Sequence, residues 1–391
     1  MKTIINSKTE SALISRGLTS IESKDLSSRG FTLSKLKCMT KAELMNLGLN
    51  DQVSNNISSE HRPPIPQKIV GKLLFDSRYT CCVCRDKNKP IIIHHIEPWE
   101  KSRSHDIGNL VVLCLEHHGE AHTKRDLSLS LTAEKIRELK GEWLNKVKEL
   151  DREIVLDVME PKEWFEEMSA CWDYFNFNRI YELAENLNIK IVDSSKHFLT
   201  LYKEGFLDKN GMLIPSQINK YVSNDSLYWL DFMGGALFGY FFKDILKKII
   251  YSTEIVIMND IWTKSQIESI LRPGTIVFLQ GAFYFRQISK SHSGKDQNRI
   301  AYRQAKGIKL EFQFNPWHCV SGSSHYNHLT GRRVATVIAI VRSLSKTNNG
   351  INIRSSCLGI GTGLNNVNNG RFNFYKLEDF EEYEEDELYV E

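Results

Sequence analysis

Residues 79–124 read YTCCVCRDKNKPIIIHHIEPWEKSRSHDIGNLVVLCLEHHGEAHTK and carry the most informative pattern in the chain. Cys81 and Cys84 have Cys-x-x-Cys spacing, and Cys114 and His117 have Cys-x-x-His spacing. Two such pairs supply the four ligands of a tetrahedral zinc site. A redox role for the first pair is less favoured, because a charged loop follows it. The spacing therefore predicts a structural Cys3His zinc that joins both ends of the stretch.

Between the two pairs, the sequence predicts two strands followed by a helix. An isoleucine run favours the first strand, and the apolar residues 110–113 favour the second. The helix carries two histidines four residues apart, which share one face. We therefore expect three imidazoles to converge on one point, those of His94, His118 and His122. His95 would face the other way, because neighbours on a strand alternate sides.

The order and spacing of these residues closely resemble the HNH, or ββα-metal, endonucleases. Asn109 matches the middle letter of that motif. The resemblance implies metal-dependent hydrolysis of double-stranded DNA. It implies that His95 is the general base and that Asn109 holds the loop of the base by hydrogen bonds. It also implies two sets of metal ligands: His94, His118 and His122 for the catalytic ion, and Cys81, Cys84, Cys114 and His117 for the structural zinc.

Two positions depart from the family pattern. His94 stands where Asp is frequent, and His117 stands where the last zinc ligand is often Cys. The histidine makes the catalytic site softer, which leaves its divalent metal open among Mg, Mn, Ni and Zn. His105, in the loop between the strands, is not assigned a role. Four bases near the motif could hold DNA phosphates, although plain surface charge is the commoner use of such residues: Lys101, Arg103, Lys124 and Arg125.

The alternative for the whole stretch is a non-enzymatic, zinc-stabilised DNA-binding protein. A zinc ribbon that only folds explains the four zinc ligands. It does not explain the additional histidines or Asn109, and this surplus favours the nuclease.

Around this stretch we expect an α+β protein: a small helical N-terminal module, the zinc-clamped nuclease domain and a mixed α/β C-terminal domain. Thr40 and Glu43 have capping-box spacing, which indicates a helix in the N-terminal module. The connecting helix has an apolar face that packs on the preceding domain or, alternatively, forms a homo-oligomer. The predicted segments are a helical module at 1–60, the HNH domain at 67–130, a connecting helix at 131–160, a sensor or target-recognition domain at 161–377, and an acidic tail at 378–391.

Composition and charge are consistent with a folded protein that binds a polyanion. With 41% hydrophobic and 25% charged residues the chain is typical of globular proteins. The formal net charge is +3, but residues 378–391 carry nine carboxylates, and without them it would be +12.

We see no signal-peptide pattern, and the longest apolar run, residues 232–242, is shorter than the roughly 20 residues that a membrane span needs. We therefore expect a cytoplasmic location and no membrane association.

The C-terminal domain carries no motif of comparable weight. Residues 281–309 contain seven bases, one acid and several interleaved aromatic residues. This segment could bind an anionic ligand, either a small nucleotide or a DNA backbone. Residues 164–187 have a helical pattern, and residues 275–279 and 334–341 have strand patterns. The layout resembles anti-phage defence effectors, in which the rear domain senses a signal, or alternatively restriction enzymes, in which it recognises modified or specific DNA.

Overall fold

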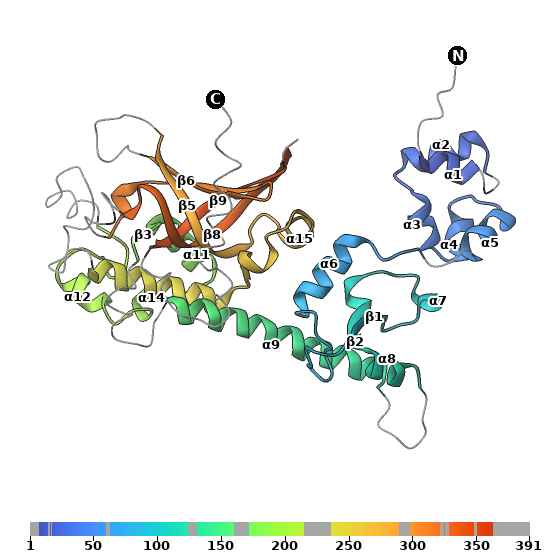
Figure 1. Ribbon diagram of the computed structural model, residues 1–391, viewed down its shortest axis with the longest axis horizontal. Coiled ribbons are helices and arrows are strands. Elements are labelled where there is room, and N and C mark those ends of the chain that lie inside the picture. Colours follow the sequence, from blue (N-terminus) through green and yellow to red (C-terminus); the bar gives the residue numbers. More distant parts are fainter. Residues whose placement is uncertain are drawn as a thin grey trace, which may run out of the picture. The chain divides into compact units, whose positions relative to one another are not determined.

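The structure is a computed structural model of the chain (Figure 1). It divides into two compact units, Met1–Asn145 and Lys146–Glu391. Both helices and sheets are present, which confirms the expected α+β class. Among the described residues, no helix combines the length and the apolar character that crossing a membrane requires. The described residues are 8–14, 16, 18–59, 63–123, 131–159, 172–214, 236–288, 298–320, 324, 328–347 and 350–362.

The first unit begins with a module of short helices around a small leucine-rich core. Capping boxes begin α2 and α4: the Thr19 and Thr40 side chains each accept from the backbone N–H three residues on, and Glu22 and Glu43 return the bond. Such reciprocal bonds stabilise short helices, which are marginal alone. The helices are α1 (Lys8–Ile14), α2 (Ser20–Ser28), α3 (Leu33–Lys37), α4 (Lys41–Asn46) and α5 (Asp51–Ser59).

The segment with the metal-ligand motifs forms a two-stranded sheet and a helix, as expected. β1 and β2 are antiparallel, with His94 opposite Val111 and His95 opposite Leu110. Leu73 of the preceding helix packs against β2 in a small apolar core. The elements are α6 (Gln67–Asp76), β1 (Ile91–His95), α7 (Trp99–Ser102), η1 (Ile107–Asn109), β2 (Leu110–Cys114) and α8 (Leu115–His122).

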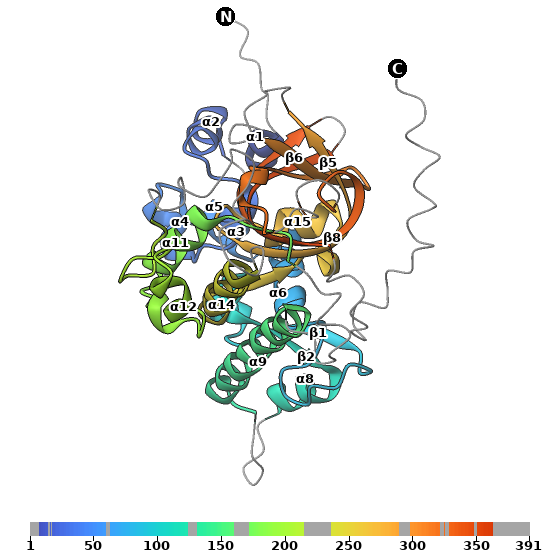
Figure 2. The same ribbon diagram turned by 90° about the vertical axis from the view of Figure 1, so that its left-hand side faces the viewer.

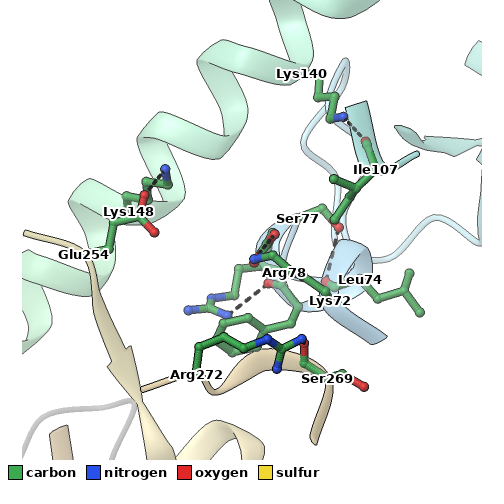
Figure 3. Close-up of polar contacts among 12 residues, drawn as sticks. Lys72, Leu74, Ser77, Arg78, Ile107, Lys140, Lys148, Glu254, Ser269 and Arg272 are labelled. Carbon is green, nitrogen blue, oxygen red and sulfur yellow. Dashed lines mark hydrogen bonds and ion pairs between the residues drawn. The ribbon is translucent and has the colours of Figure 1, made fainter. Parts of the chain in front are cut away.

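One long helix, α9 (Ala133–Met159), begins in the first unit and ends in the second. Thr132 precedes it and accepts a hydrogen bond from the backbone N–H of Lys135. Lys140 Nζ donates to the carbonyl of Ile107 at 2.6 Å (Figure 3). Trp143 is buried and donates to the carbonyl of Ser77. The apolar face of the N-terminal part of α9 therefore packs on the preceding domain of the same chain.

The second unit combines helices with a seven-stranded sheet. Its largest core packs α11 and α14 against one face of the sheet, including Ile276 and Phe278 of the strand 276–287. The helices are α11 (Phe177–Asn186), η2 (Ile191–Asp193), α12 (Phe198–Lys203), α14 (Ala236–Ser252), η4 (Met258–Ile261), α15 (Lys264–Ile270) and η6 (Pro316–His318). The strands are β3 (Tyr174–Phe175), β4 (Ile255–Ile257), β5 (Ile276–Gln287), β6 (Arg299–Ala305), β7 (Ile308–Phe314), β8 (Gly331–Thr347) and β9 (Gly350–Gly361).

Five of these strands close into a barrel, which Figure 2 shows as a ring. β5, β6 and β7 are successive antiparallel neighbours, and β8 returns to pair with β5. That order is a Greek key. β9 completes the ring, because it pairs antiparallel with β8 and parallel with β7. A five-stranded Greek-key barrel is the architecture of the OB-fold.

The predicted helix over residues 164–187 is wrong in part. Tyr174 and Phe175 form β3, which pairs with β9, and the helix begins only at Phe177. Aromatic residues favour strands, and the edge of β9 supplies the backbone partners that a helix would otherwise provide. Residues 160–171 lie outside the described part of the chain.

Candidate metal centres and nuclease site

The expected zinc ligands come together at one end of the two-stranded sheet. Ligand atoms of Cys81, Cys84, Cys114 and His117 all lie within 4.8 Å of one another. Cys84 Sγ is 3.9 Å from Cys114 Sγ, and Cys81 Sγ is 3.6 Å from His117 Nδ1. Sulfur and nitrogen ligands on the edges of a tetrahedral zinc site lie about 3.6–3.8 Å apart. The four side chains can therefore hold a metal ion.

The turn between β2 and α8 places the thiol of Cys114 where its pKa is lowered, which favours metal binding. Cys114 is the residue before α8, and its Sγ lies 3.0 Å from His117 Nδ1. Burial raises the pKa of the thiol, but hydrogen bonds from the backbone and ring of His117 outweigh it, and the pKa falls to about 7. A thiol that ionises near neutral pH binds a metal at little cost, because the ligand form is the thiolate.

A second cluster joins His94 of β1 to His118 and His122 of α8. Their ligand nitrogens also lie within 4.8 Å of one another, and the Nε2 atoms of His118 and His122 are 3.3 Å apart. Burial, followed by the nearby histidines, lowers the pKa of His94 to about 4. The same causes lower the pKa of His118. Neutral imidazoles with converging nitrogens are suited to a divalent cation.

His95 points to the other side of β1, as the alternation along a strand predicts. It is buried with Trp99 and His105, and its Nε2 lies 3.1 Å from His105 Nδ1. His105 Nε2 lies 2.9 Å from the carbonyl oxygen of Pro63, and the Trp99 ring stacks on His105 at 4.5 Å. No role for His105 could be predicted from the sequence, because its hydrogen bond to Pro63 joins residues 42 positions apart.

These contacts select one tautomer for each ring. A backbone carbonyl can only accept, so His105 donates from Nε2 to Pro63 and, when neutral, accepts at Nδ1. His95 then donates from its Nε2 to His105, and its lone pair is on Nδ1.

Asn109 holds the loop that follows β1. Its Oδ1 accepts from the backbone N–H of Glu97 at 2.8 Å, and its Nδ2 donates to the carbonyl of Glu97 and to Ser102 Oγ, both at 3.1 Å. The backbone carbonyl of Asn109 also accepts from the N–H of Ile96. The loop with Trp99 is therefore fixed at several points, and Trp99 in turn packs on His95 and His105.

Two of the four basic residues expected to contact DNA phosphates lie in the described part of the chain. Lys101 is exposed on α7, and Arg103 follows it in a left-handed conformation with its guanidinium 6.0 Å from the Trp99 ring centroid. Both lie on the loop that Asn109 holds. Lys124 and Arg125 lie outside the described residues.

The comparisons with known proteins agree with this geometry. A family model described as HNH endonuclease matches residues 81–124. The search of curated proteins and the search of solved structures each found no match to the chain. The matched segment contains both clusters, His95 and Asn109. Residues 81–124 are therefore an HNH endonuclease domain with a Cys3His cluster that could bind zinc.

Proposed function

We propose that the protein is a metal-dependent endonuclease that hydrolyses phosphodiester bonds of double-stranded DNA. The observation that carries the proposal is the position of His95. It follows His94, one member of the three-histidine cluster, on β1, points away from that cluster, and is oriented by His105. A purely structural zinc module needs neither the cluster nor the oriented ring.

In the proposed reaction His95 is the general base. Its Nδ1 accepts a proton from water, the water oxygen forms a bond to phosphorus, and the bond from phosphorus to the 3′ oxygen breaks. The 3′ oxygen takes a proton from solvent and leaves as a hydroxyl. A neutral imidazole, with an ordinary pKa of about 6.5, can accept this proton near neutral pH. The bond from His95 to His105 then becomes charge-assisted, which stabilises the imidazolium that forms. Asn109 and His105 act as positioning residues, because they fix the loop and the ring.

The catalytic ion is proposed to bind His94, His118 and His122. A divalent ion there supplies Lewis acidity that stabilises charge on the phosphate and on the leaving oxygen. Three imidazole ligands are softer than a set that contains carboxylates, so the choice among Mg, Mn, Ni and Zn is left to experiment. The structural zinc is proposed to bind Cys81, Cys84, Cys114 and His117, and Lys101 and Arg103 to contact neighbouring phosphates.

Cleavage of supercoiled plasmid with each of the four metals tests the proposal. The unaltered chain should cut with at least one of them. His95→Ala should not cut, yet should keep its bound zinc and its melting temperature. His197→Ala, in the second unit, is the matched control and should cut normally. Cleavage by His95→Ala would refute the assignment of the base, and no cleavage by the unaltered chain under any condition would favour a zinc-stabilised DNA-binding protein.

For the biological role we propose a cytoplasmic anti-phage defence effector whose second unit senses a signal, such as a small anionic ligand. The support is the layout, a small nuclease domain followed by a larger unit. The second candidate is a restriction enzyme whose second unit recognises modified or specific DNA. Cleavage that begins only after lysate from infected cells is added favours the first role. Constitutive cleavage at fixed sites favours the second.

A further inference from the structure

Among the described residues of the segment 281–309, aromatic side chains lie on both sides of the barrel strands. Phe283 and Phe285 of β5 are buried inside the barrel. Tyr284 and Arg286, which alternate with them, lie on the outer side, and Tyr302 of the neighbouring strand faces outward opposite Tyr284. The outer surface of β5 and β6 therefore carries aromatic rings beside a cation.

These outer side chains contact one another across three strands. The rings of Tyr284 and Tyr302 stack with their centroids 5.3 Å apart and their planes at 18°. The guanidinium of Arg286 lies 5.3 Å from the Tyr302 centroid, and the ammonium of Lys309 on β7 lies 5.1 Å from it. Each cation is within the distance at which the face of an aromatic ring attracts positive charge. Tyr302 is thus the centre of a cluster of rings and cations.

The strand register extends this cluster in both directions around the barrel. Arg332 of β8, which is exposed, is opposite Tyr284. Arg354 of β9, whose side chain is 72% exposed, forms an ion pair with Glu311. We call the resulting row the Tyr302 strip: Arg332, Tyr284, Arg286, Tyr302, Lys309 and Arg354.

The strip is strongly basic. Glu311 is the one acid among the described residues that forms ion pairs with the strip, and it is bonded to both Lys309 and Arg354. Burial raises the pKa of Glu311, but Lys309, Asn352 and Arg354 together outweigh it and lower the pKa, so Glu311 stays ionised. Four cations and one anion thus surround two stacked rings. This combination is complementary to a ligand with both phosphates and flat bases.

We propose that the Tyr302 strip binds single-stranded nucleic acid, with bases stacked on the tyrosines and phosphates paired with the arginines and Lys309. The strip crosses five strands, and four inter-strand steps of about 4.8 Å span roughly 19 Å. That length exceeds one nucleotide. The strip also curves around a barrel, and a flexible single strand can follow it, whereas a straight duplex contacts only part of it. The ligand would be recognised independently of the nuclease site in the first unit.

Fluorescence anisotropy with the full-length chain in the His95→Ala background tests the proposal, because the probe then survives and cleavage plays no part. The probes are a labelled deoxythymidine 20-mer, a uridine 20-mer, an abasic oligomer of equal charge, and a duplex of the same length. The thymidine or the uridine oligomer should bind at least about tenfold more tightly than the abasic oligomer, since base stacking contributes strongly to such complexes. Whichever of the two binds more tightly identifies the ligand as DNA or RNA.

Substitutions then test whether the oligonucleotide binds at the Tyr302 strip. Tyr302→Leu should weaken binding on the order of tenfold, while Tyr302→Phe should bind normally because the ring remains. Arg286→Gln with Arg354→Gln should flatten the slope of log affinity against log salt by about 1.4, as expected for two lost phosphate contacts on a single strand. Lys203→Gln on α12 is the matched charge control and should leave affinity unchanged.

Any of four results would overturn the proposal. They are no single-strand binding, equal affinity for the abasic oligomer, preference for the duplex, or arginine variants that match Lys203→Gln. If Tyr302→Leu does not fold, the exposed arginine pair still decides the question. A chain that cuts no DNA yet binds single strands through the strip would refute the proposed nuclease and leave this inference intact.

Discussion

Replacing His105 by alanine is predicted to slow DNA cleavage by about 10- to 100-fold. The wild-type His95 donates from Nε2 to His105 Nδ1 across 3.1 Å, and both rings are buried. When His95 takes up the proton of water, this bond has a charged donor, and such bonds contribute about 1.5–3 kcal/mol. At 1.36 kcal/mol per tenfold in rate, its loss corresponds to the predicted decrease.

His105→Gln provides the matched comparison. The Gln amide can accept from His95 through Oε1 and donate to the Pro63 carbonyl through Nε2, so it can replace both hydrogen bonds of His105. We expect it to recover much of the activity that alanine loses. The assay is single-turnover cleavage of plasmid at saturating divalent metal, with zinc content and melting temperature measured on the same samples. Equal rates for the alanine variant and the unaltered chain would refute the orienting role of His105. Equal losses in both variants would show that packing on Trp99 matters more than the hydrogen bonds.

Three further predictions concern stability. Chelation of the structural zinc should unfold the nuclease domain, because such a zinc contributes about 10–16 kcal/mol, which is as large as the stability of a typical domain. An unchanged melting curve after chelation would refute the zinc assignment. In urea unfolding, Gly350→Ala should destabilise the second unit by at least about 2 kcal/mol more than the control Gly274→Ala. Both glycines have a positive φ, but only at Gly350 would a Cβ clash, because it would lie 1.7 Å from the Gly307 carbonyl oxygen. The hydrogen bond to buried Asp173 raises the pKa of His328, against burial and nearby Arg333. This stabilisation is fully present below about pH 6.5 and is lost as pH rises through the raised pKa. The melting temperature of His328→Gln should therefore fall less between pH 6 and pH 8 than that of the unaltered chain, and parallel curves would contradict the pairing.

The metal-binding half of the site could be predicted because its geometry is local. Cys81 and Cys84 share one turn, and His118 and His122 share one helix face, so spacing alone constrains their side chains. The two strands of the domain are adjacent in the sequence, which left few ways to pair them. The roles of the individual residues stay predictions until cleavage is measured.

The second unit was much harder to predict, because its contacts join distant residues. Asp173 is fully buried and accepts from Ser324, His328 and Thr362, which lie about 150 to 190 positions away. No local pattern marks these residues as partners. The helical pattern near Tyr174 was misleading for the same reason, since the strand partner of Tyr174, Ile360, is equally distant.

What the sequence determined by itself was the chemistry of the HNH domain: which side chains can bind metal, which face each histidine occupies, and that Asn109 belongs with them. In a helix or a strand, the number of residues between two side chains fixes the directions in which they point. The pairing of the metal ligands depends only on those directions. The tertiary structure decided which ring orients His95, and it placed Tyr284, Tyr302 and Lys309 in one outer row of a closed barrel. Those arrangements depend on strand register and chain closure, which are set by the packing of the whole unit.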